Sequence, residues 1–95
     1  MTLSMTFREE ILNALVDDDE SIIQIENWFN YSNVKFNRPD VIKLLQQLLV
    51  EERIEIRYPY ADIGKHELNI DRIEDYWFGL TKAGKEEWDK IPNEE

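Results

Sequence analysis

The 95-residue chain contains no cysteine and only three glycines. Without cysteine it can form neither a disulfide framework nor a thiolate metal site, and nothing favours secretion. Three glycines do not supply a glycine-rich phosphate loop. The chain lacks an apolar run of the roughly 18 residues that a membrane span needs, and residues 1–7 lack the basic and apolar regions of a leader. We therefore expect a cytoplasmic protein without a membrane partner.

Basic side chains are also scarce. The chain has 11 Lys and Arg against 21 Asp and Glu, for a net charge of −10. The excess is greatest in residues 1–31, which hold one basic and seven acidic side chains. Affinity for nucleic acid depends on Lys and Arg that displace counterions from phosphates, so this charge opposes a polyanion. A partner with a basic surface fits it better.

No pattern of side chains points to catalysis or to a cofactor. His66 is the only histidine, and with Asp62, Glu67 and Asp71 it would form at most a weak, oxygen-rich metal site. An exposed loop histidine is the simpler interpretation. The serines lack the sequence context of a nucleophile elbow. We predict a protein that is not an enzyme, with no catalytic residue, no metal and no cofactor.

Large apolar side chains are sufficient for one core. Three Trp, four Tyr and four Phe are present, and burial of each contributes about 2 kcal/mol. A chain of this length has room for one domain, so one core must do all the folding. We predict a single domain over residues 1–95, with an ordered core over about residues 6–91.

Helical periodicity predicts two helices in the first third of the chain. Thr6 and Glu9 form a capping-box pattern that starts a helix over about residues 7–17. The acidic run, residues 17–20, precedes the apolar positions of a second helix that ends near residues 31–33. Carboxylates at a helix start bind free amides and favour the positive end of the helix dipole. We therefore expect the acidic run to cap the second helix.

A third helix is predicted after Asn37, a good capping residue, with Pro39 in its first turn. Its buried stripe consists of Val41, Leu44, Leu45, Leu48 and Leu49. The positions left for solvent or a partner are Arg38, Asp40, Lys43, Gln46, Gln47 and Glu51.

The period then changes from helix to strand. Residues 53–58 alternate charged and apolar side chains, which predicts a half-buried strand ended by the proline that follows. Residues 59–75 are polar, with Gly64 as the favoured turn position, and are typical of a long loop or wing. A second strand is predicted at residues 76–80. Thr81 then caps a short last helix.

This order of elements resembles the winged helix-turn-helix superfamily. Residues 40–56 resemble the third helix of that superfamily running into its first wing strand. The end of the second strand carries the Leu-Thr, Gly and distal aromatic found in many members, here Leu80, Thr81, Gly84 and Trp88. The resemblance implies an α+β fold with a three-helix core, a two- or three-stranded antiparallel wing and a short C-terminal helix. The connector at residues 31–36 and the wing are longer than usual.

In DNA-binding members of the superfamily the third helix enters the major groove and the wing touches the backbone. The resemblance assigns those roles here to Arg38, Lys43, Gln46, Gln47 and Lys65, with His66 beside them. The same surface carries acidic side chains from Asp40, Glu51 and the wing, which leave it neutral at best. A dimeric DNA-binding transcriptional regulator is therefore the alternative hypothesis.

The favoured hypothesis is an acidic winged-helix module that contacts another protein, as an adaptor, a regulator or an inhibitor. Strand alternation places Tyr76, Phe78 and Leu80 on the core face and Trp77 on the other face. The predicted interface consists of Asp17, Asp18, Asp19, Glu20, Glu26, Tyr60 and Trp77. A homodimer also stays open.

Overall fold

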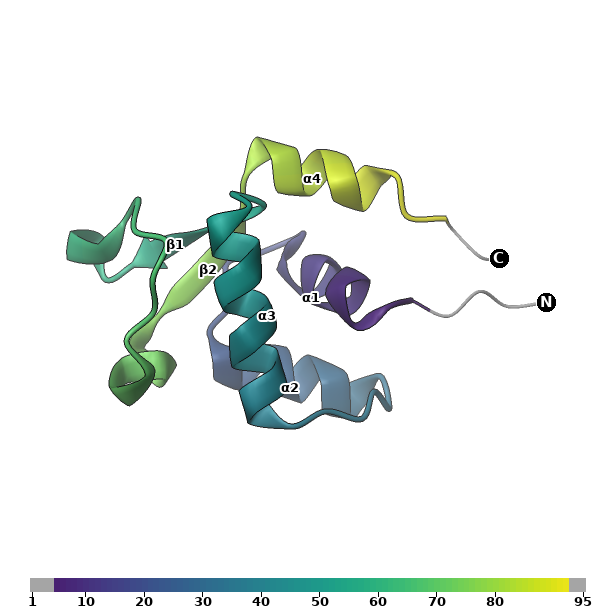
Figure 1. Cartoon of the computed structure of the whole chain (residues 1–95). Coiled ribbons are helices and arrows are strands. Elements are labelled where there is room, and N and C mark those ends of the chain that lie inside the picture. Colours follow the sequence, from purple (N-terminus) through teal and green to yellow (C-terminus); the bar gives the residue numbers. More distant parts are fainter. Residues whose placement is uncertain (1–4, 93–95) are drawn as a thin grey trace.

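The computed structural model describes residues 5–92 (Figure 1). Residues 1–4 and 93–95, which belong to the predicted domain over residues 1–95, lie outside the described residues. The fold is of the mixed α+β class, and the predicted order of three helices, two strands and a last helix is confirmed. The elements are α1 Phe7–Leu15, α2 Ile22–Tyr31, α3 Arg38–Val50, β1 Ile54–Tyr58, the short 3-10 helices η1 Tyr60–Asp62 and η2 Ile70–Asp75, β2 Trp77–Leu80 and α4 Lys82–Asp89.

Three of the helices begin as their capping residues predict. The Thr6 hydroxyl accepts a hydrogen bond from the Glu9 amide (3.1 Å), and the Glu9 carboxylate accepts one from the Thr6 amide (2.8 Å). Asn37 and Thr81 each accept from the amide three residues further on, at 2.9 and 3.0 Å. Each bond satisfies a donor that the first helical turn leaves free.

The acidic run behaves differently from its prediction. α1 ends at Leu15, two residues early, and the run does not cap α2. Ser21 is the capping residue of α2, and its amide donates to the side chain of Gln24 (3.1 Å). Glu20 instead exchanges two backbone hydrogen bonds with Phe78 in β2, at 3.0 and 2.9 Å. Because the chain must reach the edge of the sheet, this tertiary pairing prevails over the local capping pattern.

The sheet has two antiparallel strands with a bulge in β1. The pairs are Ile54↔Leu80, Glu55↔Gly79, Ile56↔Phe78 and Tyr58↔Trp77. The register shifts between Ile56 and Tyr58, so Arg57 is the extra residue. A bulge re-aims the side chains that follow it. Ile56 and Phe78 are fully buried, whereas Tyr58 is half-exposed opposite Trp77.

The core lies where the first three helices meet one face of the sheet (Figure 1). Its fully buried members are Ile11, Leu12, Ile22, Ile25, Phe29, Val41, Leu45, Leu48, Leu49, Ile56 and Phe78, with Leu15, Ile54 and Tyr76 nearly so. The core positions predicted for Tyr76 and Phe78 are confirmed, and Leu80 is partly buried against the cluster. Trp88 closes the core from α4 and donates through Nε1 to Asn13 (3.1 Å).

The connecting segment, residues 59–75, is not simply a polar loop. It contains η1 and η2, and its apolar residues Leu68 and Ile73 are buried. The segment runs back along α3 (Figure 1): His66 lies 3.8 Å from Glu52 just beyond the end of α3. Near the start of α3, Arg38 is ion-paired with Glu74. The connecting segment therefore contacts the chain near both ends of α3.

α4 docks against the turn between α3 and β1. Thr81 donates its hydroxyl to the Glu52 carbonyl (2.6 Å), and its amide donates to the Arg53 carbonyl (3.1 Å). A Cβ placed on Gly84 would lie 1.8 Å from that same Arg53 oxygen. Gly84 therefore lets α4 approach this turn closely. These contacts are the physical reason for Thr81 and Gly84 at the junction between β2 and α4.

A cluster of ion pairs joins α1, α4 and the end of α3. Glu87 accepts from Arg8 (2.6 Å) and from Arg53 (3.1 Å), and Arg8 also donates to Glu51 (2.7 Å). The hydrogen bond from Arg8 lowers the pKa of Glu87 below its usual range, while burial opposes that shift. The same bond raises the pKa of Arg8. The cluster therefore stabilises the charged form of Glu87.

We expect Gly84→Ala to destabilise the fold strongly, because the added methyl meets a backbone oxygen that cannot rotate away. The expected loss is on the order of 3 kcal/mol or more in the free energy of unfolding. Denaturant unfolding measures it. Lys85→Ala, at an exposed position next in the helix, is the control and should change stability by about 0.5 kcal/mol or less. Similar losses for both variants would contradict the proposed docking of α4.

We expect Glu87→Gln to lower the stability at neutral pH by about 1 kcal/mol, because it removes the charge that binds Arg8 and Arg53. A carboxylate whose pKa is lowered by folding stabilises the native state above its unfolded pKa, and loses that effect as the pH falls through its folded pKa. The difference from the parent chain should therefore shrink in acid. Thermal unfolding over a pH series checks this. Glu86→Gln, at an exposed neighbour, should show neither effect.

Candidate functional site

Arg38, the first predicted DNA contact, is held within the chain. Its guanidinium donates to both carboxylate oxygens of Glu26, at 2.6 and 2.8 Å, and to Glu74 at 2.6 Å. The hydrogen bond from Glu26, followed by that from Glu74, raises the pKa of Arg38. A guanidinium that already binds two carboxylates is not free to bind a phosphate.

Three more of these residues also have partners. Gln46 donates to the His66 carbonyl and accepts from the Leu68 amide (2.9 Å), so its amide group joins α3 to the connecting segment. Gln47 donates to Glu51 (2.9 Å), and Lys65 donates to Asp62 (3.0 Å). Lys43 is exposed and lines a shallow hollow near the start of α3. The predicted DNA-reading set is therefore largely occupied by intramolecular contacts.

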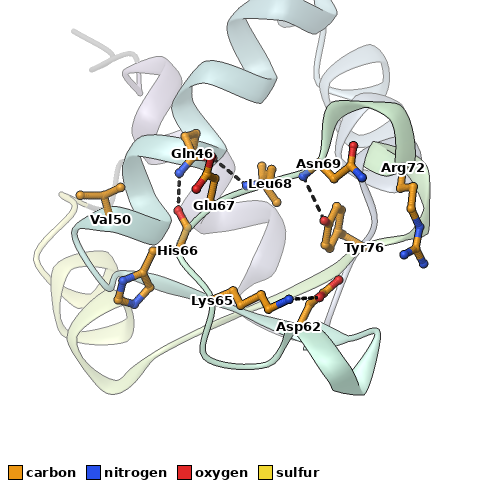
Figure 2. Close-up of a pocket in the computed structure, with 10 residues that line it drawn as sticks. All are labelled: Gln46, Val50, Asp62, Lys65, His66, Glu67, Leu68, Asn69, Arg72 and Tyr76. Carbon is orange, nitrogen blue, oxygen red and sulfur yellow. Dashed lines mark hydrogen bonds and ion pairs between the residues drawn. The ribbon is translucent and has the colours of Figure 1, made fainter.

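A hollow of about 1200 Å³ lies between α3 and the connecting segment. Figure 2 shows its lining, with Gln46 bonded to the backbone at one side and Lys65 paired with Asp62 at another. The Tyr76 hydroxyl accepts from the Asn69 amide (3.0 Å). Both signs of charge line the hollow, and within residues 5–92 no group of three His, Cys, Asp or Glu side chains is placed to hold a metal. The side chains that line this hollow do not form a recognisable catalytic or metal-binding arrangement.

The acidic run is exposed at its first three positions, Asp17, Asp18 and Asp19. Glu20 is half-buried by its pairing with β2, and this burial, followed by the charges of Asp18 and Asp19, raises its pKa. Glu26 stands apart, because its carboxylate is bound by Arg38 and its side chain is only 14% exposed. Of the predicted acidic interface, the first three positions are therefore open to a partner.

Three predicted interface residues meet in one place. Asp19, Tyr60 and Trp77 line a surface hollow together with Arg57 and Tyr58. We call it the aromatic hollow; its volume is about 370 Å³. The rings of Tyr58 and Tyr60 lie edge to face with centroids 5.4 Å apart, and the two residues are 48% and 77% exposed. Tyr60 is therefore exposed at this hollow, and its predicted contact with a partner stays a prediction.

Arg57 lines the aromatic hollow, and its side chain is 40% exposed. It pairs with Asp19 (3.5 Å) and Glu55 (3.3 Å) and donates to the Leu80 carbonyl (2.9 Å). A Cβ on Gly79 would lie 2.5 Å from Asp19 and 2.7 Å from the guanidinium. Because Gly79 has no side chain, the ion pair of Asp19 and Arg57 can lie directly against the sheet. The predicted interface did not include Arg57 or Tyr58, because no residue type marks the bulge that brings them here.

A second hollow adjoins the first and shares Asp19 and Arg57 with it. Asp17 and Asp18 line it on one side, and Lys82 and Lys85 of α4 on the other. The acidic run is thus bordered by the aromatic hollow and by two lysines. A partner that binds the run must meet the aromatic side or compete with those lysines.

No helix of the described residues is long and apolar enough to cross a membrane. Comparison of the chain with family models, curated proteins and solved structures found no match. The function is therefore inferred from the geometry and charge of the chain itself.

Proposed function

We propose that this chain is a non-enzymatic winged-helix binding module that contacts a protein with a basic surface. The observation that carries the proposal is the meeting of the acidic run and the aromatic hollow at Asp19, while most of the predicted DNA contacts are bound within the chain. The contact surface consists of Asp17, Asp18, Asp19, Tyr58, Tyr60 and Trp77.

The winged-helix assignment is supported by the order of the elements and by the docking of α4. Three helices precede a two-stranded sheet, and the connecting segment stands where a wing would join the strands. The Glu20 bridge to Phe78 resembles the third strand of such a sheet. Thr81 and Gly84 dock the last helix as the superfamily pattern leads us to expect.

A protein partner is favoured over DNA by charge and by the cost of freeing the predicted DNA contacts. Release of Arg38 would leave Glu26, a poorly exposed carboxylate, without its cation. Loss of a charged hydrogen-bond partner destabilises a carboxylate that is only partly exposed. The net charge of −10 adds long-range repulsion of phosphates and long-range attraction of a basic protein.

The test is a titration with a short peptide of alternating lysine and serine, followed by backbone amide NMR shifts. We expect shifts at residues 17–19, 57–60 and 77. The double variant Asp17→Asn, Asp18→Asn should weaken binding roughly fivefold. The control Glu86→Gln, Asp89→Asn removes the same charge from exposed positions outside both hollows. It should change affinity by about twofold or less.

The same variants are titrated with random duplex DNA over a salt series. A protein-contacting module should show no salt-dependent DNA affinity, whereas a DNA binder weakens steeply as salt rises. Tight DNA binding at low salt with shifts near Lys43 would replace this proposal with the dimeric regulator. Equal weakening by both double variants would mean that the peptide senses only the net charge, and would also overturn it.

A further inference from the structure

The geometry points to the aromatic hollow as a receptor for one cationic side chain, a lysine or an arginine, of the protein partner. This inference rests on the proposed function and adds to it the chemistry of the central contact. Asp19, Tyr58, Tyr60 and Trp77 would receive the cation, whereas Arg57, which lines the same hollow, is already paired with Asp19 and Glu55.

The three aromatic side chains that line the hollow do not form part of the core. Tyr58, Tyr60 and Trp77 are absent from the buried core, and Tyr60 is among the most exposed side chains of the described residues. Ring faces carry negative charge, and a cation within about 6 Å of a ring centre gains about 0.5–1 kcal/mol at an exposed site. A cation in a hollow lined by several rings can be attracted by more than one of them, whereas an isolated exposed ring attracts it only once.

The three aromatic side chains are held by the backbone before any partner arrives. The bulge at Arg57 brings Tyr58 opposite Trp77 across the two strands. The chain then turns at once into η1, where the Asp62 amide donates to the Pro59 carbonyl (3.0 Å). This turn brings Tyr60 back onto Tyr58. A site that is already arranged loses less conformational entropy on binding.

The charge of the hollow selects a cation rather than an anion. The guanidinium of Arg57 is offset by two carboxylates, Asp19 and Glu55, and one of its donors is used by the Leu80 carbonyl. It also lies against Gly79 at the sheet. The side chains of Asp19 and Arg57 are 45% and 40% exposed, and Asp17 and Asp18, which precede Asp19, line the adjoining hollow. Because two carboxylates pair with the one guanidinium, the charge beside the rings favours a cation over an anion.

The experiment uses the acetylated, amide-capped derivatives of lysine, norleucine and glutamate as probes of the whole chain. The readout is the NMR signal of the Trp77 indole, identified by its loss in Trp77→Phe. We expect the lysine derivative to shift this signal, and norleucine, which has no charge, to leave it in place. Tyr60→Ala should weaken the binding of lysine about threefold to fivefold.

Tyr31→Ala is the matched control, because Tyr31 is 83% exposed at the end of α2 and lines none of the hollows described above. It should leave the affinity for lysine unchanged. Tyr60 is itself so exposed that its removal should not disturb the fold, and a thermal unfolding curve verifies this.

Two results would overturn the inference alone: a lysine derivative that leaves Trp77 unshifted, or a Tyr60→Ala variant with unchanged affinity, while the basic peptide still binds the acidic run. A shift caused by the glutamate derivative instead would make Arg57 the receptor, and would also overturn it. Failure of the basic peptide to bind at the run would remove the proposed function itself, which separates the two failures.

Discussion

The backbone of Phe78 pairs on two sides, and the rest of the structure depends on that pairing. On one side it faces Ile56 of β1, and on the other it exchanges two hydrogen bonds with Glu20. The first pairing sets the strand register, and the second brings the acidic run to the sheet. Asp19 then lies over Gly79 against Arg57. The ion pair of Asp19 and Arg57, which lines the aromatic hollow, is thus a consequence of strand pairing.

The packing of the connecting segment on α3 occupies polar side chains that could otherwise bind a partner. Gln46 binds the backbone of the segment, and Arg38 binds Glu74 within it. Polar groups that a DNA-reading helix would present to DNA are bound within the fold. The exposed carboxylates and tyrosines lie on another side of the chain. The cationic partner proposed above would bind on that side.

Much of the fold could be predicted because its signals are local. Thr6, Asn37 and Thr81 bond amides within their own helices, and the spacing of apolar residues identifies the buried face of α3. Where distant pairing competes with a local pattern, prediction was wrong. The acidic run was expected to cap α2, but Glu20 is drawn to β2 and Ser21 takes the capping position.

The sequence by itself determined the element order, the core stripe and the excess of negative charge, since each follows from neighbouring residues or from composition. It also identified Asp19, Tyr60 and Trp77 as single candidates. Only the tertiary structure decided that these three meet, that Arg57 lines the same hollow and that Arg38 and Gln46 are already bound. The physical reason is that a bulge, a register and an ion pair between distant residues depend on which segments pack together, which no local pattern specifies.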